Sequence, residues 1–266
     1  MYQTTYHRAA SLEEAAKLLA QADDGKFLAG GQTLIPTMKQ RLAAPSDLID
    51  LRHIPELKGI TINGSDMRIG AGTTHAEVAA HAGLAALCPA ICRLAAHIGD
   101  PHVRHMGTIG GSIANNDPAA DYPAAVLALG ATVETSKRTI AADDFFTGLF
   151  GTALEEDEIV TAVSFSAPEK AGYAKFPNPA SRYALVGVFV ARRPEGVRVA
   201  VSGAGEDGAF RASALEDALA RSFDPAALDG ISLPSTGLMS DIHASAEYRA
   251  HLIAVMAKRA VKAAIG

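Results

Sequence analysis

Two glycine-rich segments contain the residues of this sequence that are best suited to bind a ligand. The first is AGGQT at residues 29–33, and the second is TIGGS at residues 108–112. Glycine has no Cβ, so a ligand can approach the backbone N–H groups, and successive N–H groups form a concave site for phosphate. The chain has no Walker lysine motif, so backbone and hydroxyl donors would have to bind a pyrophosphate. Together the segments favour a dinucleotide, although each alone is also typical of a tight turn.

A third glycine-rich string, GAGEDG at residues 203–208, matches the GxGxxG pattern of Rossmann folds. The strand expected before it, 197–202, follows another expected strand across a Pro-Glu-Gly turn at 194–196. This unit is a hairpin, whereas the nicotinamide site of a Rossmann fold needs a βαβ unit with a second parallel strand. We therefore interpret the string as a tight turn.

Short elements are expected to hold the first glycine segment in place. Ser11 and Glu14 form a capping box at the start of a helix, and the Asn63-Gly64 pair predicts a hairpin turn. The other elements predicted in this part are a strand at 26–29, a helical turn at 34–42, a strand at 47–51 and hairpin strands within 60–70.

The second glycine segment lies in a stretch with almost no periodicity. Residues 74–98 predict two consecutive helices interrupted at Pro89, and residues 99–120 predict a long ordered loop, which is uncommon in a domain unless it has a function. A helix at 121–130 and strands at 131–136 and 159–165 are expected after it.

The last hundred residues indicate a different organisation. Prolines and glycines between 168 and 179 predict a domain boundary or a crossing segment. Beyond it we expect strands at 184–191 and 197–202 and helices at 212–221 and 244–264, which is an α+β arrangement built on antiparallel hairpins.

Composition excludes several classes of protein. The 266 residues include 24 Lys+Arg and 29 Asp+Glu, giving a net charge of −5 without a basic run, so no nucleic-acid partner is expected. No export signal and no transmembrane segment is predicted, which favours a cytoplasmic protein. Cys88 and Cys92 are too few for a metal site and are expected to be buried reduced thiols.

No residue is predicted to be catalytic in this chain. The sequence lacks the HExxH and GxSxG motifs of metalloproteases and hydrolases. His75, His97, His102 and His105 are interpreted as structural or surface residues, because a general base needs a positioned partner. Neither a catalytic nor a metal-ligating residue is therefore assigned.

Four motifs carry a resemblance to a known family. They are AGGQTLIPTMKQRLAAPSDLIDL at 29–51, IGAGTTHAEV at 69–78, VRHMGTIGGSIANNDPAADYPAAVLALGA at 103–131 and DDFFTGLFGTALEEDEIVTAV at 143–163. In this order and spacing they resemble the FAD-binding medium subunit of molybdenum hydroxylases, the family of carbon monoxide dehydrogenase and xanthine dehydrogenase.

The resemblance implies an α+β fold with two domains. Residues 1–168 would form a two-part FAD-binding domain of the vanillyl-alcohol-oxidase (PCMH) type. Residues 169–266 would form a smaller α+β domain of the carbon monoxide dehydrogenase flavoprotein type, with an antiparallel sheet. The cofactor contacts that the resemblance implies are Lys26, Leu28, Ala29, Gly30, Gly31, Gln32, Thr33, Ile98, Gly99, Val103, Thr108, Ile109, Gly110, Gly111, Asn115, Asp121, Ile159, Val160, Lys175 and Tyr183.

Within that set, the resemblance implies particular roles. Residues 29–33 and 108–111 would bind the FAD pyrophosphate, while Ile159 and Val160 would form an apolar wall and Lys175 and Tyr183 would approach the flavin. The sequence departs from the family at His105-Met106, where Asn-Arg is common, so the usual Arg contact is lost or replaced. A typical member is also somewhat longer at the C-terminus, which affects the expected docking to partner subunits.

The function implied by the resemblance is electron transfer. FAD here would collect electrons from iron–sulfur clusters on a small subunit, which receive them from a large molybdopterin subunit, in a dimer of heterotrimers. Two alternatives stay open on the residues alone. A self-sufficient FAD-dependent oxidase or reductase of the same fold would need its own substrate pocket, and a nucleotide-binding regulatory module would need only the glycine segments.

Overall fold

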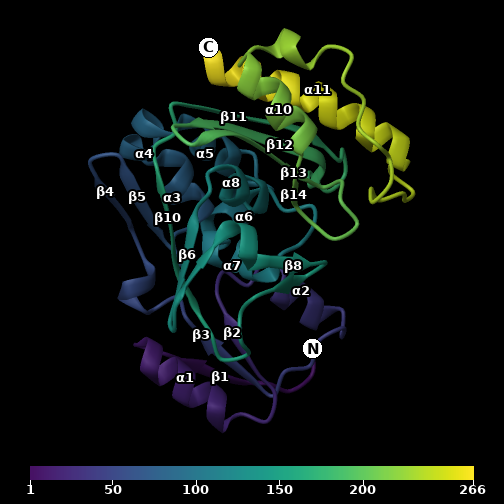
Figure 1. Ribbon diagram of the computed structural model, residues 1–266. Coiled ribbons are helices and arrows are strands. Elements are labelled where there is room, and N and C mark those ends of the chain that lie inside the picture. The colour runs from purple at the N-terminus through teal and green to yellow at the C-terminus, as the bar shows by residue number, and fades with distance from the viewer.

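The computed structural model describes residues 1–266 (Figure 1). Its apolar side chains form one large core of 39 buried residues and a second core of 19 buried residues. Strands from the C-terminal third contribute to both cores, because residues such as Phe189 face the large core and Val188 and Val190 face the other. The C-terminal sheet therefore separates two layers of packing.

A small parallel sheet lies at the N-terminal end of the molecule. Its strands are β1 (Thr5–Arg8), β2 (Gly25–Leu28) and β3 (Asp47–Asp50), in the order β1-β3-β2, with α1 (Leu12–Gln21) and α2 (Leu34–Lys39) as connections. The Ser11 hydroxyl caps α1 as predicted, while the Glu14 carboxylate accepts the N–H of Ala10 at 2.7 Å. The carboxyl ends of three parallel strands meet at one edge of this sheet.

A second, antiparallel sheet has the order β4-β5-β10-β6-β7. The predicted hairpin turns at Gly64, which has φ of +59°. The strand β10 pairs with both β5 and β6, so the chain crosses back through the middle of the sheet after a long excursion. Its strands are β4 (Ile60–Asn63), β5 (Asp66–Gly70), β6 (Thr132–Thr135), β7 (Thr139–Ala141) and β10 (Val160–Ser166), preceded by the 3-10 helix η1 (Pro55–Leu57).

The excursion between β5 and β6 is more helical than predicted. Three helices replace the expected two, namely α3 (His75–Ala80), α4 (Ala82–Leu87) and α5 (Pro89–Ala96). The expected loop at 99–120 contains α6 (Pro101–Met106) and α7 (Ile109–Asn115), followed by α8 (Tyr122–Ala128). The prediction of a loop was wrong because the side chains of Asp100 and Thr108 cap these two short helices, which compensates for their low intrinsic propensity.

The C-terminal part consists of an antiparallel sheet in the order β11-β12-β13-β14 with α10 and α11 on its outer face (Figure 1). The segment expected to be a boundary forms β11, because its prolines lie at or beyond the strand ends and Gly172 allows the strand to approach α11 closely. The bounds are β11 (Lys170–Pro177), β12 (Ala184–Arg193), β13 (Gly196–Ser202), β14 (Phe210–Arg211), α10 (Ser213–Arg221), the 3-10 helix η2 (Pro225–Leu228) and α11 (Ala246–Ile265).

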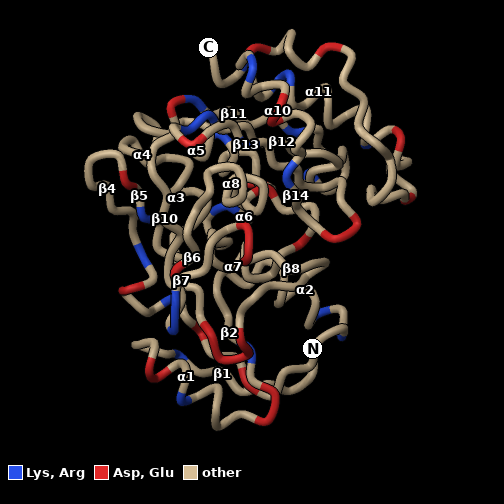
Figure 2. Tube along the Cα trace, in the orientation of Figure 1, with Lys and Arg blue, Asp and Glu red and all other residues tan.

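The remaining elements are α9 (Ala142–Phe145) and a small hairpin of β8 (Phe146–Gly148) and β9 (Gly151–Thr152). The buried amide of Asn116 fixes this hairpin by donating to the carbonyl oxygens of Gly148 and Gly151. Charges of both signs are distributed along the chain without an extended basic run (Figure 2). No helix combines the length and the apolar character that a membrane crossing requires.

Candidate functional site

A cavity of about 840 Å³ lies where the parallel sheet, the helical excursion and the C-terminal sheet meet. Its volume falls in the upper part of the range of about 300–1,000 Å³ that is usual for ligand pockets. Every residue predicted to contact a cofactor lines this cavity except Ile109, whose side chain is fully buried in the large core. The structure thus brings together residues that are up to about 150 positions apart in the chain.

The first glycine segment follows β2 and supplies unpaired backbone donors. None of the N–H groups of Gly30, Gly31, Gln32 and Thr33 donates a hydrogen bond within the protein. Gly31 has φ of +71°, a left-handed conformation that glycine adopts without strain. Four consecutive free donors along a cavity wall suit an anion with several oxygen atoms.

The second glycine segment has most of its N–H groups already engaged. The N–H of Ile109 donates to Thr73 O at 3.2 Å, that of Gly110 to Ala71 O at 2.9 Å, and that of Gly111 to the Thr108 hydroxyl at 3.1 Å. A Cβ on Gly110 would overlap Ala71, so this glycine permits close packing. The segment therefore shapes the cavity, and its free donors are the N–H of Thr108 and the hydroxyl of Ser112.

The first glycine segment contacts the backbone that immediately precedes the second segment. A Cβ on Gly30 would overlap the Met106 carbonyl and lie 2.7 Å from the Cα of Gly107. Met106, which stands where the family commonly has Arg, therefore contributes its backbone to this contact. His105 turns its ring back to the Pro101 carbonyl at 2.6 Å. Neither side chain lines the cavity.

The end of the cavity near the C-terminal sheet contains a buried ion pair. The ammonium of Lys175 lies 2.9 Å from Asp121 Oδ1, and the Tyr173 hydroxyl donates to the same carboxylate. Both charged side chains are at most 5% exposed. Burial raises the pKa of Asp121, and the charge of Lys175 opposes that shift. Asp121 does not cap α8, so its side chain is committed to the cavity wall.

Another part of the wall is formed by β2, by the residues that follow β3 and by the start of β10. Lys26 and Leu28 come from β2, and Ile159 and Val160 form the expected apolar wall beside Glu158. Arg138 is the main cause that lowers the pKa of Glu158 to about 2, and the Thr135 hydroxyl donates to it at 2.6 Å. Glu158 is therefore ionised, and Arg138 and Thr135 occupy its carboxylate.

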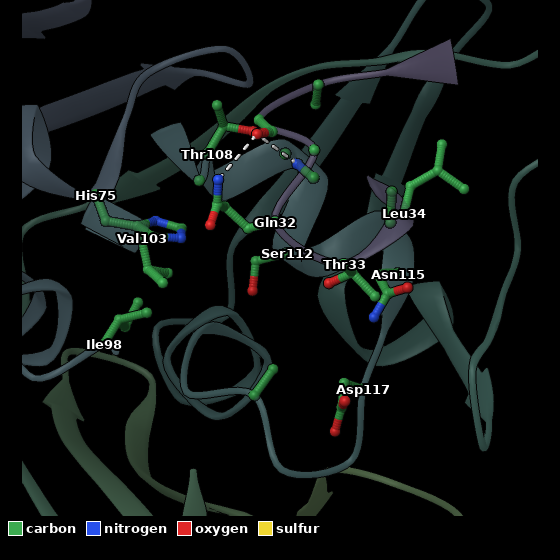
Figure 3. A pocket seen from close by; sticks show the side chains of 18 of the residues that line it. Gln32, Thr33, Leu34, His75, Ile98, Val103, Thr108, Ser112, Asn115 and Asp117 are labelled. Atoms are coloured by element: carbon green, nitrogen blue, oxygen red, sulfur yellow. Dashed lines mark hydrogen bonds between the residues drawn. The ribbon is translucent and has the colours of Figure 1, made fainter. Parts of the chain in front are cut away.

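Figure 3 shows His75, Ile98 and Val103 on one side of the cavity and Thr33, Asn115 and Asp117 on the other. The His75 side chain is buried, and its Nδ1 has no hydrogen-bond partner. Burial lowers the pKa of His75 to about 4, so the ring is neutral at pH 7. The neutral, unpaired imidazole thus lies in the wall of the cavity, where its structural role stays a prediction.

Several lining residues were not predicted, including Arg52, His75, Asp117, Glu158, Ser181 and Arg182. Arg52 had a signal that could have been used. It lies two residues after the end of β3, which lies beside β2, and ligands bind at the carboxyl ends of parallel strands. Asp50 holds its guanidinium with hydrogen bonds of 2.7–3.1 Å. His75 lies at the start of α3, and Asp117, Glu158, Ser181 and Arg182 lie on connections whose folded positions have no local sequence signal.

The residues of the cavity fit FAD. Four unpaired N–H groups offer donors for a pyrophosphate, the missing Cβ atoms allow two backbone segments to meet beside it, and apolar side chains form part of the wall. No Cys side chain lines the cavity. The structure contains no group of three or more His, Cys, Asp or Glu side chains that could hold a metal ion.

Comparisons with known proteins agree with this geometry. The family described as "FAD binding domain in molybdopterin dehydrogenase" matches residues 2–168. The nicotine 6-hydroxylase medium subunit of Paenarthrobacter nicotinovorans is 38% identical over 96% of this chain and 95% of its own length. The carbon monoxide dehydrogenase medium chain of Afipia carboxidovorans is 36% identical over 97% of this chain and 96% of its own.

A solved structure of carbon monoxide dehydrogenase from Hydrogenophaga pseudoflava is also similar, with a TM-score of 0.88 and 36% identity. The match covers 99% of this chain and 97% of that one. The resemblance and the fold class that we predicted from the four motifs are confirmed. The chain therefore belongs to the family of FAD-binding medium subunits of molybdenum hydroxylases.

Proposed function

We propose that this chain carries FAD as an electron-transfer subunit, receiving electrons from iron–sulfur clusters and passing them to an external acceptor. The observation that carries the proposal is the single large cavity lined by the four free N–H groups of residues 30–33. Family membership supports FAD as the occupant. When bound, FAD supplies a centre that takes electrons singly and releases them as a pair.

We infer the direction in which the cofactor lies. Residues 29–33 and 108–112 meet near the middle of the cavity, where they would bind the pyrophosphate. Tyr183 presents an aromatic ring at the C-terminal end, beside Ile98 and Lys175, and would contact the flavin ring. The adenosine would then extend toward Lys26, Leu28 and the wall formed by Ile159 and Val160.

The chain's own residues would bind and orient the cofactor. The Lys175–Asp121 pair fixes β11 against the start of α8 and so sets the width of the cavity at its flavin end. Gly99 and Val103 lie on the facing wall, where Gly99 has φ of +49°. No side chain of the cavity forms a nucleophile and base pair, which supports electron transfer over substrate chemistry.

The proposal extends to the domains and the assembly. Residues 1–168 would bind FAD, and residues 169–266 would cover its flavin end. A small iron–sulfur subunit and a large molybdopterin subunit would complete a dimer of heterotrimers. The similar proteins are medium subunits of multi-subunit enzymes, which supports partners of this kind.

The test combines a cofactor assay with an activity assay. Acid precipitation of the purified chain should release one FAD per chain into the supernatant. Dye reduction with aldehydes, heterocycles and carbon monoxide should be absent with the chain alone and present with the co-purified complex. Turnover by the chain alone would favour the self-sufficient oxidase, and a colourless chain that takes up no FAD would contradict the proposal.

A further inference from the structure

Four carboxylates line the cavity, and three of them have a structural role. Asp121 pairs with Lys175, Glu158 pairs with Arg138 at 3.1 Å, and Asp100 caps α6 by accepting the N–H of Val103 at 3.0 Å. The pKa of Asp100 is lowered by hydrogen bonds from the backbone of α6. These three side chains are held by partners that the fold requires.

Asp117 is the exception. Its carboxylate accepts one hydrogen bond, from the N–H of Ala119 at 2.8 Å, and has no cation within ion-pair distance. Partial burial is the main cause that raises its pKa. Asp117 therefore differs from Asp121 and Glu158 in that its carboxyl can gain and lose a proton without breaking an ion pair, and from Asp100 in that its pKa is raised and not lowered.

Asp117 also lies at a junction between two cavities. A second pocket of about 230 Å³ adjoins the main cavity and shares Asp117, Ser181 and Tyr183 with it. The charged or titratable groups on its other walls are Asp241, His243 and Arg249. The Arg249 guanidinium is committed to Asp241 at 2.7 Å and to two carbonyl oxygens, whereas Asp241 and His243 are exposed to solvent.

The neighbours on the main-cavity side place Asp117 at the flavin end. Asp117 and Asp121 both contribute to the raised pKa of Tyr183, although burial is the larger cause. Asp117 is thus close to the aromatic side chain that we expect to contact the flavin ring. A pocket large enough for several water molecules, with polar walls, lies on its other side.

We propose that Asp117 is the proton-transfer group of this chain, passing protons between water in the second pocket and the flavin end of the main cavity. The inference rests on the proposed FAD function. Full reduction of FAD takes up two electrons, supplied singly by iron–sulfur clusters, and two protons. Asp117 releases a proton toward the reduced cofactor and regains one from water, and the direction reverses when an acceptor removes the electron pair.

The test uses the FAD-loaded full chain with the variant Asp117→Asn. Asparagine keeps the hydrogen bond to the Ala119 N–H but carries no transferable proton. Asp224→Asn is the matched control, because Asp224 makes the same kind of bond to the N–H two residues ahead, Ala226 at 2.7 Å, and lines neither cavity. FAD content, the visible spectrum and the melting temperature of both variants are measured first.

The decisive measurement is the rate at which the flavin is protonated after rapid photoreduction, followed by absorbance in H₂O and D₂O. We expect Asp117→Asn to slow this step about 100-fold, with a solvent isotope effect, while Asp224→Asn matches the unmodified chain. Formate, a weak acid small enough for the second pocket, should restore the rate in Asp117→Asn.

The outcomes separate this inference from the proposed function. An unchanged rate, or a slow rate that formate does not restore, overturns the role of Asp117. Loss of FAD from Asp117→Asn also overturns it, since Asp117 would then be a binding contact. Absence of FAD from the unmodified chain contradicts the proposed function itself.

Discussion

The glycine segments at the cavity and the glycine string at 203–208 are similar in sequence but differ in what they border. In both regions a Cβ would overlap backbone, that of Met106 for Gly30 and that of Gly208 for Gly205. Gly30 and Gly31 line the large cavity and leave their N–H groups free, whereas Gly205 and Gly208 line neither cavity. A missing side chain therefore allows close packing in both regions, but only the segments at the cavity present free donors to it, among them those of residues 30–33.

Topology explains the difference. The first segment follows β2, whose neighbour β3 runs parallel, so several chain segments end at the same edge of the sheet. The string at 203–208 follows β13, which pairs antiparallel with β12, and the chain turns back immediately to β14. A turn between antiparallel strands closes on itself, whereas an edge of parallel strands leaves space that other elements can cover.

The largest expected effect comes from adding a side chain to Gly30. Gly30→Val would push residues 29–33 away from Met106 and Gly107 and would close part of the cavity. We expect FAD content to fall at least tenfold, with a lower melting temperature. The ratio of FAD to protein after gel filtration, determined from released flavin, measures the effect.

Gly205→Val is the matched control for Gly30→Val. Its side chain would also overlap backbone, at 2.5 Å from the Gly208 carbonyl oxygen, so the melting temperature should fall here too. The folded fraction should nevertheless retain its FAD. Loss of FAD from Gly205→Val, together with full retention of FAD by Gly30→Val, would contradict the proposal that the segment at 29–33 binds the cofactor and the string at 203–208 does not.

The next largest effect is a loss of stability on replacing a buried cation, either Lys175 beside the large cavity or Arg249 beside the glycine string at 203–208. Lys175→Met leaves Asp121 buried without its ion-pair partner and should cost about 3–5 kcal/mol in the free energy of unfolding. Arg249→Met removes hydrogen bonds to the carbonyl oxygens of Leu185 and Gly203 and should cost about 3 kcal/mol. Only Lys175→Met should weaken FAD binding, as measured by titration of the FAD-free protein.

The stability of Lys175→Met should depend on pH, and the pKa of Asp121 determines the direction of this dependence. Burial raises the pKa of Asp121, and without Lys175 only Tyr173 and His97 oppose that shift. The native state then binds the proton more tightly than the unfolded state, so stability is highest below the unfolded pKa and falls as the pH rises through the folded pKa. Urea unfolding between pH 5 and pH 8 should show this fall. A stability that does not change with pH would contradict the raised pKa of Asp121 in this variant.

A smaller loss of stability is expected on replacing Glu158, which lines another part of the cavity. The folded pKa of Glu158 is lowered to about 2, mainly by Arg138, so its stabilising contribution is present above the unfolded pKa and is lost as the pH falls through about 2. Glu158→Gln should cost about 2 kcal/mol at neutral pH. The difference from the unmodified chain should shrink between about pH 4.5 and pH 2 in acid unfolding experiments.

The sequence predicts the fold where the signals are local. The capping position of Ser11, the Asn63-Gly64 turn and the long apolar pattern of 184–191 each identify an element that the structure contains. The short helices at 101–106 and 109–115 were missed because glycine and proline lower the helical signal, and single side-chain caps decide the outcome. The strand β11 was missed because tertiary contact with α11 stabilises it.

The candidate site was predictable mainly as a set of motifs. Nineteen of the twenty predicted contacts line the cavity, which leaves out only Ile109, and this agreement comes from the family resemblance that four motifs in a fixed order carry. The sequence did not predict that the first glycine segment has free N–H groups and that the second has most of its N–H groups engaged. The N–H groups of 109–111 are engaged by residues distant in sequence or by a side-chain cap. Asp117 was also missed as a distinct group, since its lack of a partner emerges only in the folded chain.

The smallest expected loss of stability comes from removing one helix cap, either at Thr108 or at Ser245. The Thr108 hydroxyl accepts the N–H of Gly111 at 3.1 Å at the start of α7, and the Ser245 hydroxyl accepts the N–H of Tyr248 at 3.2 Å at the start of α11. Replacing either residue by Ala removes one capping bond and should cost about 1 kcal/mol in the free energy of unfolding. Thermal and urea unfolding measure both variants under the same conditions.

FAD affinity should distinguish these two caps although their stability costs are similar. Thr108 borders the cavity and contributes to the shape of the second glycine segment, whereas Ser245 lies at the start of a helix on the outer face of the C-terminal sheet. We expect Thr108→Ala to weaken FAD binding about fivefold, equivalent to about 1 kcal/mol, and Ser245→Ala to leave the Kd unchanged. Equal losses of affinity in both variants would mean that global stability, and not the geometry of the second glycine segment, controls cofactor binding.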